Sequence, residues 1–463
     1  MSEHVAYIVK INELHPHSNA DRLQIATIFS NNVIVDLNTQ IGDFGVYFPI
    51  DLQLSEEYCK VNDLVRRKDE NGNPAGGYLD PEKRNIRAMK LRGEKSEGLF
   101  MPLTSLAYTG ETKFEIGDKI DIVNGHEICR KYIPRGNRSF SAHTRQGNKT
   151  RKHSVPIAPL FAEHADTEQL VYNMNAFKPG DQIEITLKMH GTSGRTGYLP
   201  KFQGYKRTLL DKIFRRQGTP IYDWGYVTGT RRVVLNDFED GGFYGSNAFR
   251  EPHAKFFEGK LWKGETVYYE IVGFTNTGIP IMPQVSNDRI SDKKFRKRYG
   301  EVTTFSYGCV SWPREDEKQS DMYVYRMTMT NEDGDVIEYS PDFMRYRCEQ
   351  MGVKYVPLFC KATIDEEGIH AYAPFKELIG LPHETNIVGD TVKEIAERYY
   401  DGPDPIGKTH VREGVVVRIV NRPKFTAYKH KNFSFKVLEG LAKDIATEPD
   451  MEEAQEVNEN DEC

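Results

Sequence analysis

The sequence predicts an α+β protein in which a small β-barrel precedes a larger domain of mixed strands and helices. Residues 1–129 indicate the barrel, because short alternating runs such as 33–37 and 45–49 are separated by turn signals. Residues 157–443 indicate the larger domain, because strand-like and helix-like patterns are mixed there. At 463 residues with 38% hydrophobic side chains, the chain can build two cores.

Three segments carry the prediction for the larger domain. Residues 183–187 alternate between apolar and polar, which is typical of a half-buried strand, whereas 391–400 have helical periodicity. Residues 414–420 are almost continuously apolar, as in a strand that is buried on both faces. We therefore expect sheets with associated helices between 157 and 443.

Charge is distributed unevenly along the chain. The net charge is -6, but residues 444–463 hold nine acidic side chains and no basic one. The rest of the chain carries 62 basic and 59 acidic residues, a net charge of +3, which is compatible with nucleic-acid binding. Such an acidic segment with scattered apolar residues cannot offset its ordering entropy, so we expect 444–463 to be disordered.

A basic segment at 130–156 separates the two predicted domains. It carries eight Lys or Arg residues, no acid, and interspersed aromatic and His residues. Such a segment is either a solvated linker or a strap that follows a phosphate backbone, since basic groups displace counterions and aromatic rings stack on unpaired bases. Under the second interpretation, RNA contacts are expected from Arg135, Arg138, Lys149 and Arg151.

The remaining composition indicates a soluble, cytoplasmic protein, which we expect to be a monomer with no membrane partner. No run of eighteen apolar residues is present, and the first residues lack the build of a secretory signal. The six cysteines form no Cys-x-x-Cys pair, which argues against a zinc ribbon and against a disulfide framework.

The strongest candidate for chemistry is Lys188, in Lys188-Met189-His190-Gly191. The pattern Lys-x-x-Gly alone is weak, because Lys90, Lys95, Lys201 and Lys297 match it as well. Lys188 differs in context, because it ends an alternating strand and is followed by Thr192-Ser193-Gly194-Arg195. Further motifs follow downstream: Thr230-Arg231, Tyr268-Tyr269-Glu270-Ile271-Val272-Gly273, Tyr323-Val324-Tyr325-Arg326, Glu413-Gly414-Val415-Val416-Val417-Arg418 and Tyr428-Lys429-His430-Lys431.

In this order, over 188–431, the motifs resemble those of ATP-dependent RNA ligases of the type-two-like family, which belong to the covalent nucleotidyltransferases. The front half adds a second resemblance. His15-Pro16-His17-Ser18-Asn19-Ala20-Asp21-Arg22-Leu23 and Lys90-Leu91-Arg92-Gly93 resemble OB-fold RNA-binding domains, and the branch of RNA ligases with an N-terminal OB module. The resemblance implies an OB fold with Arg22, Lys90 and Arg92 on nucleic acid, then a nucleotidyltransferase (ATP-grasp-like ligase) domain of antiparallel sheets flanked by helices.

The resemblance implies that Lys188 is the nucleophile that takes AMP from ATP. The attacking amine must be neutral, although a free lysine side chain, with a pKa near ~10.4, is charged at neutral pH. Neighbouring cations disfavour the charged form, and the candidates are Lys429, Lys431 and a bound Mg²⁺ or Mn²⁺ ion. The same cations would offset charge that grows on the phosphoryl oxygens.

The other motif residues have implied roles in binding nucleotide and metal. Glu413 and Glu270 lie on apolar strands, where an unpaired charge is costly, so each should meet the metal, metal-bound water or a ribose hydroxyl. Arg231 resembles the arginine that reaches the sugar and phosphate. Tyr325 resembles the aromatic residue that stacks on adenine, with Phe305 and Tyr323 as alternatives, and His190 and Gly191 complete the nucleotide-binding set.

Two alternative functions stay open at this point. Capping guanylyltransferases share the chemistry with GTP, although they usually carry a C-terminal OB domain, for which the 32 residues after Lys431 give no room. A non-catalytic RNA-binding protein would bind RNA without taking up a nucleotide. The ligase hypothesis predicts sealing of RNA ends, at a nick in a duplex with ribose on the 3′-hydroxyl side. The basic run 293–298 either contacts nucleic acid or is only solvated.

Overall fold

A computed structural model gives the coordinates for most of the chain. The residues it describes are 5–50, 52–68, 75–110, 113–132, 156–164, 167–214, 216–231, 233–235, 237–239, 246–290, 292–366, 368–372, 391–439 and 442–444. Four predicted RNA contacts, Arg135, Arg138, Lys149 and Arg151, and the acidic segment beyond 444 lie outside these residues.

Contacts divide the chain into two compact units, each discontinuous in sequence. Unit 1 comprises Met1–Gly136, Ser286–Glu301 and Phe433–Cys463, and unit 2 comprises Asn137–Val285 and Val302–Asn432. The boundaries drawn along the chain at 1–129, 130–156, 157–443 and 444–463 stay predictions. Unit 1 thus takes up a segment, 286–301, that lies by sequence inside the predicted catalytic region.

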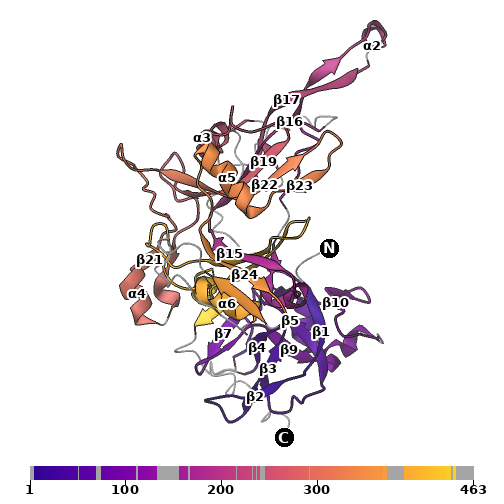
Figure 1. Cartoon of the computed structure of the whole chain (residues 1–463). Helices are drawn as coiled ribbons and strands as arrows, with labels where there is room; N and C mark the ends of the chain where they lie inside the picture. Colours follow the sequence, from indigo (N-terminus) through magenta and orange to yellow (C-terminus); the bar gives the residue numbers. More distant parts are fainter. Residues whose placement is uncertain are drawn as a thin grey trace. The chain divides into compact units, whose positions relative to one another are not determined.

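Unit 1 is built from short strands, most of which pair antiparallel (Figure 1). Its main sheet has the order β10 (Lys119–Ile120), β1 (Ala6–Lys10), β5 (Phe44–Phe48), β9 (Leu99–Pro102). Two three-stranded sheets complete it, β2 (Leu14–Pro16), β3 (Leu23–Ile28), β4 (Asn31–Asp36) and β28 (Ala442–Asp444), β7 (Ala88–Leu91), β8 (Glu94–Ser96). The Glu97 amide donates to the Asn32 carbonyl at 2.8 Å and so connects the sheets. The strands predicted at 33–37 and 45–49 are confirmed as β4 and β5.

Smaller elements of unit 1 complete the barrel. They are β6 (Leu52–Leu54) with β13 (Cys129–Lys131), β11 (Ile122–Val123) with β12 (His126–Glu127), α1 (Glu56–Val61), α4 (Lys293–Tyr299) and α7 (Phe433–Leu438). Ile8, Val46, Phe48 and Leu106 are buried in the common core. Apolar residues at alternate positions of short strands therefore make the barrel interior, as the alternation predicts.

Unit 2 contains two six-stranded sheets. The first has the order β14 (Glu168–Gln169), β27 (Thr426–Lys431), β26 (Gly414–Ile419), β15 (Gln182–Lys188), β24 (Leu358–Ile364), β25 (Ile369–Tyr372). The second has the order β18 (Val234–Leu235), β17 (Thr219–Gly229), β16 (Thr192–Lys206), β19 (Glu265–Gly273), β22 (Ser320–Thr330), β23 (Val336–Glu338). All pairs are antiparallel except β14 with β27.

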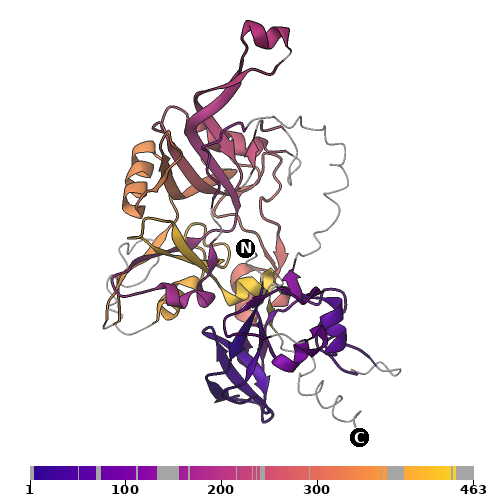
Figure 2. The ribbon, with the colours of Figure 1, turned by 90° about the vertical axis from the view of Figure 1, so that its right-hand side faces the viewer.

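The helices of unit 2 are short. They are α2 (Leu209–Ile213), α3 (Glu251–Lys255), α5 (Pro341–Met351) and α6 (Val392–Tyr400). Helix α6 begins with a capping box, in which Thr391 and Glu394 satisfy each other's backbone amides, and it buries Ile395 and Tyr399. The helix predicted at 391–400 is therefore confirmed. The hairpin of β16 and β17 extends beyond its sheet and carries α2 at its end (Figures 1 and 2).

The connection between the two sheets positions the candidate site. Strand β15 ends at Lys188 in the first sheet, and β16 begins at Thr192 in the second. Residues 189–191 are therefore the crossing from one sheet to the other, and side chains of both sheets converge there. This places Lys188-Met189-His190-Gly191 at the junction of the two layers.

Two further sequence predictions concern cysteines and membrane spans. Cys59, Cys129, Cys309, Cys348 and Cys360 are free and buried, as expected for packing cysteines. Within the described part of the chain, no helix combines the length and apolar character needed to cross a membrane.

Candidate active site

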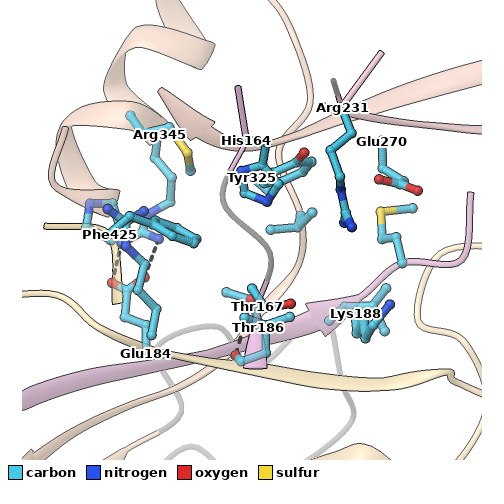
Figure 3. A pocket seen from close by; sticks show the side chains of 17 residues that line it. His164, Thr167, Glu184, Thr186, Lys188, Arg231, Glu270, Tyr325, Arg345 and Phe425 are labelled. Atoms are coloured by element: carbon cyan, nitrogen blue, oxygen red, sulfur yellow. Dashed lines mark hydrogen bonds and ion pairs between the residues drawn. The ribbon is translucent and has the colours of Figure 1, made fainter. Parts of the chain in front are cut away.

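A pocket lies between the two sheets of unit 2. It is partly open to solvent and is lined by residues of both sheets. Lys188 and Glu270 lie at one end and Glu184 and Phe425 at the other, with Tyr325 and His164 between them (Figure 3). Of the predicted nucleotide-binding residues, Lys188, Arg231, Glu270 and Tyr325 line this pocket directly.

Strand register brings the two lysine motifs together. Lys188 of β15 pairs with Gly414 of β26, and Gly414 pairs with Lys431 of β27. Directly paired residues share a face of the sheet, so Lys188 and Lys431 project to the same side, and Lys429 does so two residues along. Lys201 and Lys297, which also match Lys-x-x-Gly, lie on β16 and α4 and do not line the pocket.

Glu413 is the acidic residue that contacts both lysine motifs at the junction of the two sheets. Its Oε1 lies 2.7 Å from Lys188 Nζ and 3.4 Å from Lys431 Nζ. Burial by itself raises the pKa of this carboxyl, but Lys188, Lys431 and His190 outweigh burial, and the pKa is strongly lowered. Glu413 is therefore an anion that holds two lysine side chains beside each other, although only 2% of it is exposed.

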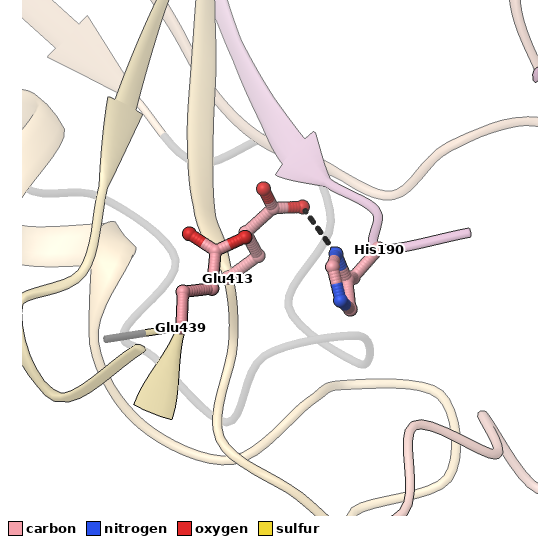
Figure 4. Close-up of side chains that lie close together, drawn as sticks. All are labelled: His190, Glu413 and Glu439. Carbon is pink, nitrogen blue, oxygen red and sulfur yellow. Dashed lines mark ion pairs between the residues drawn. The ribbon is translucent and has the colours of Figure 1, made fainter. Parts of the chain in front are cut away.

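His190 braces this arrangement from the adjoining residue. Its Nδ1 lies 3.7 Å from Glu413 Oε2 (Figure 4). The His190 amide donates to the Tyr307 hydroxyl at 2.7 Å, and its ring packs edge-on against Phe305 with centroids 4.6 Å apart. Phe305, one of the alternatives for the stacking aromatic, thus packs on His190 and does not line the pocket.

The glycines of the two main motifs are required by close approaches of the backbone. A Cβ at Gly191 would lie 2.4 Å from the Ile271 carbonyl oxygen and 2.9 Å from Glu270 Cγ. Gly414 has φ +149, and a Cβ there would lie 2.1 Å from the His430 carbonyl oxygen. Both glycines therefore let the chain pass close enough to bring the acidic and basic side chains together.

Glu270 lies on β19, opposite Ser193 of β16. Burial raises the pKa of Glu270 to about 7; Lys188 and Arg231 oppose this shift, whereas Glu413 adds to it. The two carboxyls therefore differ in character, because Glu413 is firmly anionic and Glu270 is close to half-protonated at neutral pH. A cation at this end of the pocket would favour the charged form of Glu270.

Tyr325 reaches the pocket through an irregularity of its strand. In the pairing of β19 with β22, Tyr268 pairs with Arg326 and Tyr269 with Val324, so Tyr325 is the extra residue of a β-bulge. Its hydroxyl is 3.1 Å from Ser193 Oγ, and its ring meets His164 edge-on with centroids 5.0 Å apart. Tyr323, the other alternative, does not line the pocket.

Arg231 follows β17 and borders the pocket near Glu270 (Figure 3). The preceding carbonyl, that of Thr230, accepts from Nε of the buried Arg195 at 2.9 Å. Arg195 also donates to the Phe161 carbonyl at 3.1 Å. A buried guanidinium thus fixes the backbone that carries Arg231.

Several residues in and around the pocket were not predicted from the sequence. His164 and Phe425 form aromatic walls with Tyr325, and Glu184 is held by two hydrogen bonds from Arg345, at 2.6 and 2.9 Å. Arg250 donates to the Ser193 carbonyl at 3.0 Å and to Thr192 Oγ1 at 2.6 Å, and so fixes the start of β16. Isolated residues of these kinds have no distinctive spacing; only the alternation of β15 places Glu184 on the same face as Lys188.

The predicted nucleic-acid contacts Arg22, Lys90 and Arg92 of unit 1 are exposed on two neighbouring loops and on strand β7. Arg92 lies in the turn between β7 and β8, and its Nη1 donates to the Asn19 carbonyl at 3.3 Å. Arg22 follows Asn19 in the loop before β3, and Lys90 is on β7. The loop carrying Arg22 and the turn carrying Arg92 therefore lie side by side.

The acidic residues also fit a divalent metal ion. Glu413 Oε2 is buried and has no hydrogen-bond partner among the described residues. Carboxylate oxygens are ligands that Mg²⁺ and Mn²⁺ prefer, and Glu270 offers a second carboxyl with a raised pKa. The pocket therefore combines an amine, two carboxyls, cationic side chains and an aromatic wall, which suits phosphoryl chemistry on a bound nucleotide.

Comparison with known proteins establishes the fold. A family model described as an OB-fold domain matches residues 5–103, so the barrel of unit 1 is an OB fold. Among solved structures, a Naegleria gruberi RNA ligase mutant with AMP and Mn is 16% identical, covers 94% of this chain and 98% of that chain, and has a TM-score of 0.53. The chain has the fold of an RNA ligase.

Two further structures of the Naegleria gruberi enzyme agree with this. A mutant with ATP and Mn and the ligase with PPi are each 15% identical, cover 94% of this chain and 98% of theirs, and have TM-scores of 0.51. No curated protein matches the chain. The predicted fold class, an OB fold followed by a nucleotidyltransferase domain of antiparallel sheets, is confirmed.

Proposed function

We propose that this protein is an ATP-dependent RNA ligase that works through a covalent Lys188-AMP intermediate. Lys188 Nζ attacks the α-phosphorus of ATP, a P–N bond forms, and pyrophosphate leaves. The AMP then moves to the 5′-phosphate of an RNA end, and a 3′-hydroxyl displaces AMP as the phosphodiester bond forms. Each step exchanges one bond at phosphorus and needs no oxidant or reductant.

The observation that carries this proposal is the pairing of Lys188 with buried Glu413 at one end of the pocket between the two sheets. A lysine held at 2.7 Å from an anion, with Lys431 Nζ at 3.4 Å from the same oxygen, is positioned and also crowded by a second cation. The attacking amine must be neutral, so Lys188 loses a proton before it attacks.

Glu413 and Glu270 are the residues that would hold a divalent metal. When bound, the metal supplies positive charge that stabilises the phosphate oxygens and favours the neutral amine. Lys431 and Arg231 contribute cationic groups to the same end, where negative charge grows in the transition state. Lys429, on the same sheet face, adds to this field.

The rest of the pocket suits the nucleoside. With the α-phosphate at Lys188, the base lies toward Tyr325, His164 and Phe425, whose rings offer flat apolar faces. Glu270 would accept a hydrogen bond from a ribose hydroxyl or from a metal-bound water. It interacts electrostatically with both Lys188 and Arg231. His190 and Gly191 shape the turn that presents Lys188.

The proposed substrate is a nick in a duplex, with ribose on the 3′-hydroxyl side. A 2′-hydroxyl and A-form shape distinguish RNA from DNA, and an OB fold supplies a surface for holding the strand. Comparing ligation of nicked duplexes that carry either RNA or DNA at the 3′-hydroxyl strand tests this. Sealing of RNA alone is expected, and equal sealing of both would contradict the RNA preference.

The decisive test of the chemistry is covalent labelling. The purified protein is incubated with Mg²⁺ and α-labelled ATP or GTP, denatured, and examined for label on the polypeptide. ATP labelling is expected. Label from GTP alone would indicate a capping-type enzyme, and no label from either, in protein shown to be folded and not already adenylylated, would indicate an RNA-binding protein.

Lysine variants assign the label to its site. Lys188→Ala is expected to abolish labelling, because Lys188 is the only lysine among the described residues that lines the pocket. Lys90→Ala and Lys95→Ala are matched controls that remove lysines of the same Lys-x-x-Gly pattern from unit 1, and both should keep wild-type labelling. Label on the Lys188→Ala protein would refute the site.

A further inference from the structure

The basic run 293–298 is part of a folded excursion, Ser286–Glu301, that belongs to unit 1. The excursion leaves unit 2 between β20 (Val285–Ser286) and β21 (Val302–Thr303), which pair with each other. Its base is closed by Asn287, whose amide donates to the Glu301 carbonyl at 2.9 Å and whose Nδ2 donates to the Gly300 carbonyl at 2.8 Å. The basic residues are therefore presented from a defined structure.

Helix α4 concentrates positive charge within this excursion. Asp292 caps its start, Gly300 ends it at φ +78, and Phe295 is its only buried side chain. Four of its basic side chains are exposed, those of Lys293, Lys294, Lys297 and Arg298. Lys293 with Lys297 and Lys294 with Arg298 are spaced i, i+4, an arrangement in which like charges destabilise a helix.

Little negative charge within the protein compensates α4. Among the described residues, the only ion pair of these basic side chains is Arg296 with Asp288, at 4.0 Å. Acidic residues are otherwise common on this protein, whose Asp and Glu residues outnumber its Lys and Arg residues. A helix with five basic side chains in seven positions, four of them without an acidic partner among the described residues, is consistent with an anion supplied from outside.

A second basic pair lies on the same unit. Lys90 of β7 and Lys95 of β8 are directly opposite in the strand register, which again sets like charges on one face. Lys95 Nζ lies 5.1 Å from the ring centre of Phe433, at the start of α7. At the other end of α7, the Leu438 carbonyl accepts from Arg289 Nη1 at 3.2 Å, just before α4.

Helix α7 therefore lies between the lysine pair and Arg289, which precedes α4. Its six residues span about 9 Å at the usual rise of an α-helix. Its own lysine, Lys436, is neutralised by Glu97 with 2.5 Å between charged atoms. The lysine pair on β7 and β8 thus lies near one end of α7, and Arg289, three residues before the cap of α4, lies at the other end.

We propose that α4, together with Lys90 and Lys95, forms a face that binds the phosphate backbone of the RNA substrate. The identity of the ligand rests on the proposed function, whereas the chemistry of the face is that of a polyphosphate-binding surface. Exposed lysines act as point charges on phosphate oxygens, so the face would hold RNA without reading its sequence. It would position the duplex on the OB unit while the catalytic pocket acts on the ends.

The test is the salt dependence of RNA binding by the full chain. The probe is a nicked RNA duplex, bound to wild type and to a variant with Lys293→Gln, Lys294→Gln, Lys297→Gln and Arg298→Gln. Loss of four phosphate contacts should lower the slope of log affinity against log salt by about 3.6. Between 50 and 200 mM salt, wild type should therefore lose roughly 100-fold more affinity than the variant does.

A control variant removes the same charge from elsewhere on unit 1, with Lys10→Gln, Lys60→Gln, Lys83→Gln and Lys113→Gln. It should keep the wild-type slope. An unchanged slope in the α4 variant, or equal losses in both variants, would overturn the proposal, because the effect would then be absent or would belong to net charge. A double variant, Lys294→Gln with Lys297→Gln, should show about half the slope change.

Covalent labelling with ATP separates this inference from the proposed function. The α4 variant should label as wild type does, since α4 carries none of the pocket residues. If wild type takes up no label but the α4 variant still loses its salt slope, the ligase proposal fails and the phosphate-binding face stands. If labelling is normal and the slope is unchanged, the ligase proposal stands and the face is refuted.

Discussion

The basic residues of the candidate pocket and those of α4 have the same sign of charge but differ in burial and in their acidic partners. In the pocket, Lys188 and Lys431 share one buried carboxylate, and only 22% and 16% of their side chains are exposed. On α4, four basic side chains are exposed and have no acidic partner among the described residues. The first arrangement fixes the positions of individual charged atoms. The second spreads positive charge over an exposed surface.

This difference matches the role proposed for each region. Chemistry at phosphorus needs one amine at one position, so its charges are buried and oriented by opposite charges. Holding a polyanion needs counterion release, which depends on the number of exposed cations more than on their geometry. Substitutions in the pocket should therefore affect rate and nucleotide affinity, and substitutions on unit 1 should affect RNA affinity and its salt dependence.

Of the substitutions predicted to affect the pocket, Glu413→Gln should have the largest effect. It leaves Lys188 and Lys431 beside each other without an anion and removes the proposed metal ligand. Formation of the lysyl-AMP should fall by at least ~100-fold, measured as the initial rate of labelling. Stability should fall by roughly 1–3 kcal/mol in urea unfolding, since charged hydrogen bonds are lost.

Glu265→Gln is the matched control for that change. Glu265 is a fully buried carboxylate that pairs with Arg347 at 2.7 Å but lies away from the pocket. It should destabilise the protein at least as much as Glu413→Gln and leave the labelling rate of the folded protein near wild type. A labelling loss as large as that of Glu413→Gln would mean that stability, and not the site, explains both.

Glu270→Gln should change how stability depends on pH. The pKa of Glu270 is raised by burial to about 7 from an ordinary 4.5, so the folded state binds its proton more tightly than the unfolded chain does. This contribution is fully present below pH 4.5 and is lost as pH rises toward 7. Relative to wild type, Glu270→Gln should therefore gain up to roughly 3 kcal/mol between pH 4.5 and 8.

Urea unfolding of both proteins across this pH range measures the gain. Other titrating groups are common to the two proteins and cancel in the difference. A stability difference that stays constant with pH would show that Glu270 ionises normally in the folded state, and it would remove the distinction between the two pocket carboxyls.

Tyr325→Leu should raise the KM for ATP roughly 5- to 150-fold with little change in kcat, because a stacking contact with a base contributes ~1–3 kcal/mol. Tyr325→Phe keeps the ring and loses only the contact with Ser193, so its KM should stay near wild type. Tyr323→Leu removes a ring from the same strand that does not line the pocket. A larger KM effect for Tyr323→Leu than for Tyr325→Leu would reverse the assignment.

The smallest effect is expected on the side of unit 1, for a single basic residue. Arg92→Ala should weaken RNA binding only a few-fold and lower the salt slope by about 1, with labelling unchanged. Arg92→Lys keeps the positive charge but loses the guanidinium group that donates to the Asn19 carbonyl. Its salt slope should therefore match that of wild type. A slope lowered equally by both changes would mean that Arg92 acts on loop structure and not on phosphate.

The sequence predicts the part of the site that depends on local pattern. Lys188 ends an alternating strand, and Glu413 precedes a continuous apolar one, so β15 and β26 and their motif residues are foreseeable. The two lysine motifs come together because register sets Lys188, Gly414 and Lys431 in one row. Where the motif and the strand coincide in sequence, the prediction follows from the residues alone.

Features that depend on long-range packing could not be predicted. The bulge that turns Tyr325 into the pocket interrupts the alternation, so alternation cannot choose between Tyr323 and Tyr325. The walls formed by His164 and Phe425 come from segments with no strand or helix pattern of their own. The assignment of 286–301 to unit 1 depends on contacts with α7, which is more than 130 residues away in sequence.

The most direct test of the account is to locate the nucleotide on the chain. Protein incubated with ATP and Mg²⁺ is digested, and peptide mass spectrometry identifies the residue that carries AMP. AMP is expected on Lys188, with Lys90, Lys95, Lys201 and Lys297 unmodified. AMP on any of those four lysines instead, or a covalent adduct nowhere on folded protein, would contradict it.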